Sequence, residues 1–121
     1  MIVAIHAFEN TYGGLHGIEH HLVVEVADIK EAEELAADES REVIESFCMD
    51  EIRGYADAEV ENGEMEEDSS EYDEYINDCI EENIAYVIWE VVDRYATIEQ
   101  MQEDFYNSKD EFVKEHCREI E

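Results

Sequence analysis

The first quarter of the chain contains two short apolar segments with a polar, glycine-containing segment between them. Residues 2–8 (IVAIHAF) are β-branched and aromatic, as in a β-strand, and residues 22–27 (LVVEVA) have the same character. Residues 10–21 hold three of the five glycines, which predicts a loop or a wide turn. We therefore expect an antiparallel hairpin closed by this loop.

The pattern then changes to a helical spacing. Asp28 lies three residues before Glu31, which is the spacing of a capping box and predicts the start of a helix. One stripe of apolar residues follows at helical intervals, so this helix is expected to pack on the sheet. The members of the stripe are Ile29, Ala32, Leu35, Ala36, Val43, Ile44 and Phe47.

Residues 48–62 fit two patterns. Cys48, Ile52 and Ala56 continue a helical stripe, which favours a helix. Gly54 interrupts this stripe, and residues 55–61 also alternate in part like a strand. We expect a helix here, with a strand as the alternative.

The acidic middle of the chain leads into a second β-branched segment. A turn and acidic loop are predicted at residues 62–70, followed by a helix over residues 71–82. Residues 84–92 (IAYVIWEVV) are crowded with β-branched and aromatic side chains, which favours a central strand. A continuous helix over residues 71–95 is the competing interpretation, because apolar residues there also fit helical spacing.

Two capping-box pairs predict short helices near the C-terminal end. They are Thr97 with Gln100 and Ser108 with Glu111. The complete pattern predicts one α+β domain over residues 1–121. Its three-stranded antiparallel sheet is expected to be covered on one face by about four helices, with an acidic outer surface.

The composition excludes several classes of protein. Thirty-six Asp and Glu residues stand against seven Lys and Arg, so the formal net charge is −29. Such a chain is not expected to bind nucleic acid or an anionic membrane, because binding either of them requires a positively charged protein surface. Leu, Ile, Val and Phe number 29 of 121 residues, which is 24%. This share predicts a folded chain rather than a disordered one.

The acidic residues are spread along the chain, but the basic ones are not. No Lys or Arg occurs in the 40 residues between Arg53 and Arg94, which contain fifteen Asp and Glu residues. Like charges held close together destabilise a fold, so this arrangement indicates a partner that supplies the compensating charge.

A comparison with DNA gives the charge a scale. A compact chain of this length is about 35 Å wide, and duplex DNA carries about 20 charges over that distance. This chain carries a net charge of −29. A site whose Lys and Arg side chains are aimed at phosphates is therefore able to accept these carboxylates instead.

In size, charge and the unbalanced stretch at residues 54–93, the chain resembles small acidic phage-encoded inhibitors that mimic nucleic acid, of the anti-CRISPR or anti-restriction type. The resemblance implies a basic nucleic-acid-binding partner, a CRISPR effector nuclease or a restriction-type enzyme, whose DNA-reading arginines or duplex channel the inhibitor occupies. It also implies a location in the cytoplasm of a bacterial host. The N-terminal residues lack the basic region of a signal peptide, which points the same way.

The expected partner-binding residues lie in the acidic middle of the chain. They comprise thirteen carboxylates and two tyrosines that are candidate interface anchors. The set is Asp57, Glu59, Glu61, Glu64, Glu66, Glu67, Asp68, Glu71, Tyr72, Asp73, Glu74, Tyr75, Asp78, Glu81 and Glu82. We expect a monomer, because like-charge repulsion opposes self-association.

No pattern indicates an enzyme or a cofactor. Paired carboxylates are too abundant to identify a catalytic pair, and no set of Ser, His and Asp indicates a nucleophile. Cys48, Cys79 and Cys117 lack CxxC spacing, so we expect reduced thiols. We therefore expect no catalytic site, no cofactor and no metal.

A cluster of histidines leaves one alternative open. His16, His20 and His21 stand with Glu19 in the glycine-containing loop, and His6 is near if the first strand passes beside it. Imidazole and carboxylate are ligands of zinc or nickel, although this spacing matches no known zinc motif. The alternative functions are thus a metal- or ligand-binding module at this loop, or a small acidic accessory protein.

Overall fold

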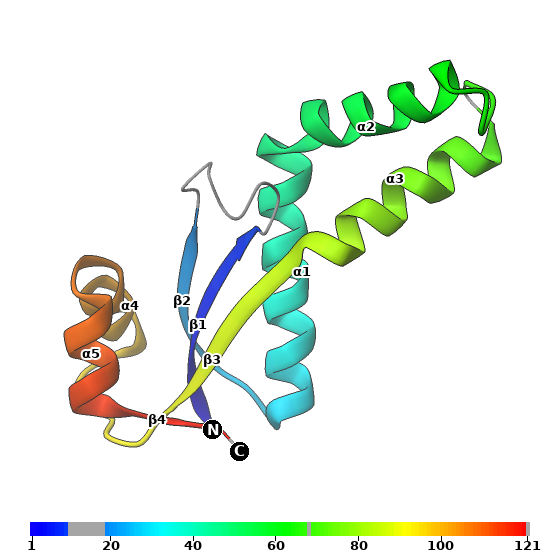
Figure 1. Ribbon diagram of the computed structural model, residues 1–121. Helices are drawn as coiled ribbons and strands as arrows, with labels where there is room; N and C mark the ends of the chain where they lie inside the picture. Colours follow the sequence, from blue (N-terminus) through cyan, green and yellow to red (C-terminus); the bar gives the residue numbers. More distant parts are fainter. Residues whose placement is uncertain (10–18, 68, 121) are drawn as a thin grey trace.

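The computed structural model describes residues 1–9, 19–67 and 69–120, so residues 10–18 of the predicted loop lie outside it. The described residues form four strands and five helices (Figure 1). In chain order these are β1 (Ile2–Glu9), β2 (His20–Glu25), α1 (Ile29–Phe47), α2 (Met49–Glu61), α3 (Ser70–Asn83), β3 (Ile84–Val91), α4 (Ile98–Asn107), α5 (Lys109–His116) and β4 (Cys117–Glu119).

The four strands form one antiparallel sheet in the order β2-β1-β3-β4. The α+β class and the antiparallel pairing of β1 with β2 are confirmed, but the predicted number of three strands is wrong. The additional strand, β4, is only three residues long, which is too short for any alternation of side chains to mark it. It pairs with the end of β3, where Val91 lies opposite Cys117.

Helices cover both faces of the sheet, so the expectation of helices on one face is also wrong. Val3 and Ile5 of β1 pack toward α1, where they meet Ala32. Ala4 faces the other way and packs in a cluster with Phe105 of α4 and Phe112 of α5. Because β1 is buried on both sides, its residues form a continuous apolar run rather than an alternating one.

Helices α2 and α3 form an antiparallel hairpin that projects away from the sheet (Figure 1). The predicted helix over residues 48–62 is confirmed in α2, with Gly54 inside it. An apolar cluster at the base of the hairpin joins Ile44 of α1 to Ile52 of α2 and Ile80 of α3. The chain passes from α3 directly into β3 at Ile84, which confirms the strand and excludes the continuous helix.

The predicted helix starts are mostly confirmed. Asp28 caps α1 by accepting a hydrogen bond from the Glu31 amide at 2.9 Å. The Thr97 hydroxyl accepts one from the Gln100 amide at 3.2 Å. Ser108 precedes α5 as expected, but its side chain makes no capping hydrogen bond. All three cysteines are free thiols.

A buried serine ties α1 to two strands. The hydroxyl of Ser40 donates to the Phe8 carbonyl of β1 and accepts from the Ala85 amide of β3 at 3.0 Å. Ser40 is fully buried and its two partner residues are partly buried, so few other partners are available to these backbone groups. This link fixes the point at which the hairpin rejoins the sheet.

Replacing Ser40 by Ala is expected to destabilise the protein by about 1–3 kcal/mol, because a partly buried amide and a partly buried carbonyl lose their shared partner. Urea unfolding followed by circular dichroism measures the change. Ser46→Ala is the matched control, since Ser46 lies exposed on the same helix and its loss should change stability little. Equal stability of Ser40→Ala and Ser46→Ala would contradict the role assigned to the buried hydroxyl.

Candidate functional site on the acidic hairpin

We define the acidic hairpin as residues 49–83, that is α2, α3 and the turn between them. It contains fifteen Asp and Glu residues and a single basic residue, Arg53. The predicted partner-binding residues all fall within it, and each is described except Asp68. The predicted residues span 26 sequence positions, from Asp57 to Glu82, and the described ones all lie on this one projecting hairpin.

Local signals in the sequence build the hairpin. Gly63 has a φ of +77°, a backbone conformation that favours glycine, and it allows the chain to turn after α2. Ser69 begins α3, because its hydroxyl accepts a hydrogen bond from the Tyr72 amide at 3.1 Å. The acidic first turn of α3, with Glu71 and Asp73, suits the positive end of the helix dipole.

The other end of α3 is electrostatically unfavourable. Glu81 and Glu82 lie at the negative end of the helix dipole, and no basic residue occurs in the last turn of either α2 or α3. Arg41 of α1 gives partial compensation. Its Nη2 donates to Asn77 Oδ1 at 2.9 Å and approaches a carboxylate oxygen of Glu81 at 3.9 Å.

Most carboxylates of the hairpin are exposed to solvent. Glu59 is partly buried. The exposed members of the predicted set are Asp57, Glu61, Glu64, Glu66, Glu67, Glu71, Asp73, Glu74, Asp78, Glu81 and Glu82. Exposure leaves them available to a partner, and it also limits the cost of their mutual repulsion, because water and salt screen the charges.

A cavity of ≈ 330 Å³, wide open to solvent, lies between the two helices of the hairpin and the turn that joins them. Five carboxylates and two less polar side chains line it: Glu59, Glu64, Met65, Glu71, Glu74, Tyr75 and Asp78. Such a lining matches a Lys or Arg side chain, whose methylene stem packs on apolar groups while its charged head meets carboxylates. No pattern in the sequence pointed to Met65, because its position depends on how α2 and α3 pack.

Two carboxylates at this cavity are close enough to perturb each other. A side-chain hydrogen bond with Glu64, followed by repulsion from its charge, raises the pKa of Glu59. Burial, followed by the neighbouring Cys79, raises the pKa of Tyr75. The raised pKa of Glu59 indicates that Glu59 and Glu64 lie close enough to share a hydrogen bond and to repel each other when both are charged.

The two candidate anchor tyrosines are arranged differently. The Tyr72 hydroxyl donates to Asp57 Oδ1 at 2.9 Å and so joins α3 to α2. Tyr75 is partly buried and lines the cavity. Tyr72 thus holds the hairpin together, whereas Tyr75 is positioned to contact a bound side chain.

Two of the acidic residues within positions 54–93 lie outside the hairpin and have a basic side chain nearby. Glu90 on β3 accepts hydrogen bonds from Arg118 of β4, the shorter at 3.0 Å. Asp93 lies 3.2 Å from Nδ1 of His116. The other acidic residues within positions 54–93 all lie on the hairpin.

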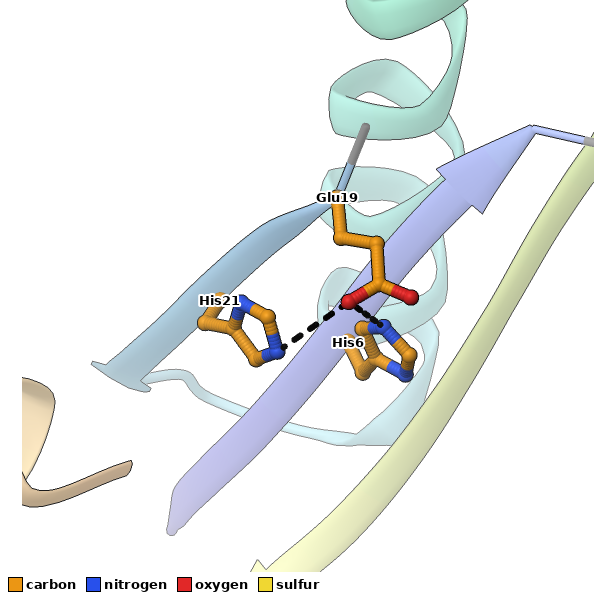
Figure 2. Close-up of side chains that lie close together, drawn as sticks. All are labelled: His6, Glu19 and His21. Atoms are coloured by element: carbon orange, nitrogen blue, oxygen red, sulfur yellow. Dashed lines mark ion pairs between the residues drawn. The ribbon is translucent and has the colours of Figure 1, made fainter. Parts of the chain in front are cut away.

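The structure separates the histidines that the sequence groups together. His20 and His21 belong to β2 rather than to a loop, so their side chains point to opposite faces of the sheet. His20 contacts Glu39 of α1 at 2.9 Å. His21 lies beside His6 and Glu19 on the other face (Figure 2). His16 lies outside the described residues.

Glu59→Gln is expected to raise the thermal unfolding midpoint at neutral pH and to reduce its pH dependence. Because the folded-state pKa of Glu59 lies above the ordinary value of 4.5, folding takes up protons between these two values. The wild-type protein should therefore lose this contribution to stability as pH rises through that window. Thermal unfolding measured from pH 4 to pH 8 tests this.

Glu61→Gln is the matched control for this comparison. It removes one charge from the same helix, but Glu61 does not line the cavity. An equal gain in stability from both substitutions would assign the effect to total charge rather than to the contact between Glu59 and Glu64.

No family model matches this chain, and no match was found among curated proteins or solved structures. None of the helices in the described ranges is long and apolar enough to cross a membrane.

Proposed function

We propose that this protein is a non-enzymatic inhibitor that mimics DNA with carboxylates. Its target is the nucleic-acid-binding site of a host defence nuclease, in the first place a CRISPR effector. The observation that carries the proposal is the projecting hairpin, on which fifteen acidic residues accompany one basic residue.

The charge density of the hairpin supports the proposal. Helix α3 has 14 residues, which at a rise of about 1.5 Å per residue gives a length of about 21 Å. Duplex DNA carries about 12 phosphate charges over that distance. The hairpin has a formal charge of −14, from fifteen acidic residues and Arg53. A surface adapted to DNA thus meets a comparable density of negative charge.

The cavity between α2 and α3 supports a basic protein partner in particular. Five carboxylates surround a space that also offers Met65 and Tyr75. Arg is the side chain that phosphate-binding sites favour, because its planar guanidinium forms paired hydrogen bonds with anions. An arginine that reads or grips DNA would enter this cavity and make equivalent hydrogen bonds with carboxylates.

The location of the hairpin favours occlusion. It contacts the rest of the protein at its base, through the cluster around Ile52 and Ile80. The distal turn and the outer faces of both helices remain open to solvent (Figure 1). A hairpin held in this way can enter a basic channel while the sheet stays outside it.

Partner capture with DNA as the eluent tests the function. The immobilised protein is incubated with a bacterial lysate and with purified CRISPR effectors loaded with guide RNA. Bound proteins are then eluted with short duplex DNA, or in parallel with a salt gradient. We expect a nuclease that DNA displaces; a partner that binds DNA and this protein simultaneously would overturn the proposal.

Reversal of hairpin charges is expected to abolish inhibition of the captured nuclease. The variant changes four residues together to Lys: Glu66, Glu67, Asp73 and Glu74. The new lysines would repel the basic site of the nuclease. Such repulsion costs several kcal/mol of binding free energy, so the affinity for the nuclease should fall about 100-fold or more. DNA cleavage by the nuclease at increasing inhibitor concentration gives the readout.

The control variant changes Glu33, Glu34, Asp38 and Glu103 to Lys. These four residues are also exposed, and they lie on α1 and α4 rather than on the hairpin. Both variants therefore have the same net charge. Mimicry by the hairpin predicts that the control still inhibits; equal loss in both variants would show that total charge, and not the hairpin, is responsible.

A further inference from the structure

A second group of ionisable side chains lies on the sheet, apart from the acidic hairpin. His6 and His21 are directly opposite each other in the pairing of β1 with β2. Glu19, immediately before β2, turns its carboxylate toward both rings (Figure 2). One Glu19 carboxylate oxygen lies 3.2 Å from Nε2 of His6 and 3.8 Å from Nε2 of His21.

The strand register creates this cluster. Residues that lie directly opposite on antiparallel strands project to the same face of the sheet, so His6 and His21 lie side by side. Their rings stack at a centroid distance of 4.7 Å. Phe105 and Tyr106 of α4 pack edge-on against the ring of His21.

One nitrogen atom that faces Glu19, Nε2 of His6, is buried without a well-aligned hydrogen-bond partner among the described residues. The side chain of His6 is 9% exposed, and the contact of its Nε2 with the Glu19 carboxylate at 3.2 Å lacks hydrogen-bond geometry. A buried polar atom without a hydrogen bond is costly, and an absent ion is one recognised explanation.

Both imidazoles also favour the neutral form. Burial lowers the pKa of His6, against the opposing effect of Glu19, and burial followed by the proximity of His6 lowers the pKa of His21. Lys109 contributes a smaller effect in the same direction at both rings. A neutral imidazole offers a lone pair, which is the form that binds a metal.

We propose that His6, Glu19 and His21 form a binding site for a divalent transition-metal ion, with Zn²⁺ as the first candidate. Their three ligand atoms lie within 4.8 Å of one another. Ligands at about 2.1 Å from a tetrahedral zinc ion lie about 3.4 Å apart, close to the 3.2 Å and 3.8 Å between the Glu19 oxygen and the two Nε2 atoms. Two histidines and one glutamate are also a known zinc ligand set that leaves a coordination position open.

Metal binding requires a small change at the two rings. The two ring planes are inclined by only 14°, so the nitrogen lone pairs lie in nearly parallel planes and do not converge on one point. A rotation about χ2 lets the lone pairs converge on one ion, and this torsion is broad for histidine. Glu19 can follow, because its side chain is 44% exposed.

Titration of the full-length protein with ZnCl₂ in excess Mg²⁺ tests the proposal. Mg²⁺ occupies the many surface carboxylates, which bind hard cations, whereas imidazole ligands select Zn²⁺. We expect one equivalent of Zn²⁺ to bind and to raise the thermal unfolding midpoint by several degrees. Absence of a one-to-one zinc complex under these conditions would overturn the proposal.

Substitutions locate the ion. Glu19→Gln and His21→Gln should each weaken zinc binding by about 100-fold or more. Removing a residue that is only hydrogen-bonded to a metal ligand weakens binding by roughly 10–100-fold, and removing the ligand itself should have a larger effect. Glu19 is exposed, so Glu19→Gln keeps the test valid even if a substitution of a buried histidine disturbs folding. Substitution of Co²⁺ for Zn²⁺ adds a visible absorption spectrum that reports coordination by nitrogen ligands.

Two histidine variants serve as controls. His116→Gln removes a histidine that pairs with Asp93 elsewhere, and zinc affinity should remain unchanged. His20→Gln removes the neighbouring histidine that faces Glu39 and Glu42, a second group able to hold an ion. Zinc binding that is lost in His20→Gln but retained in His21→Gln would place the ion in that second group and refute the site proposed here.

Discussion

Burial of β1 on both faces is the interaction on which the rest of the structure depends. Val3 and Ile5 pack toward α1, while Ala4 packs toward Phe105 on the opposite side. A net charge of −29 opposes compaction, so the apolar core must offset a repulsion that an ordinary domain of this size does not have. The two-sided core leaves the outer faces of the helices to carry the carboxylates.

The acidic hairpin extends this separation of core and charge. Its apolar residues meet only at the base and along the contact between α2 and α3, so its remaining surface is open to water. Repulsion there is screened, but it is not removed, because Glu64 raises the pKa of Glu59. A fold under selection for stability alone gains nothing from that arrangement. A cationic partner that enters the cavity would relieve the repulsion, and this relief would contribute to binding.

Much of the fold follows from local sequence signals, while the sites depend on packing and register. The β-branched segments became β1 and β3, and Asp28 capped α1 as expected. Strand β4 was missed because three residues are too few to show a pattern. The pairing of His6 with His21 required the strand register, since a slip of one residue would send one ring to the other face. The cavity beside Met65 likewise exists only once α2 and α3 have packed together.

The salt dependence of affinity for the captured nuclease tests the central claim most directly. Its dissociation constant is measured at several salt concentrations for the wild-type protein and for the hairpin variant with four lysines. If carboxylates of the hairpin contact a basic channel, the logarithm of the wild-type binding constant should fall steeply as the logarithm of the salt concentration rises. DNA bound at such sites shows the same dependence. Such contacts also predict a much shallower dependence for the variant. A wild-type affinity that does not change with salt would contradict the account.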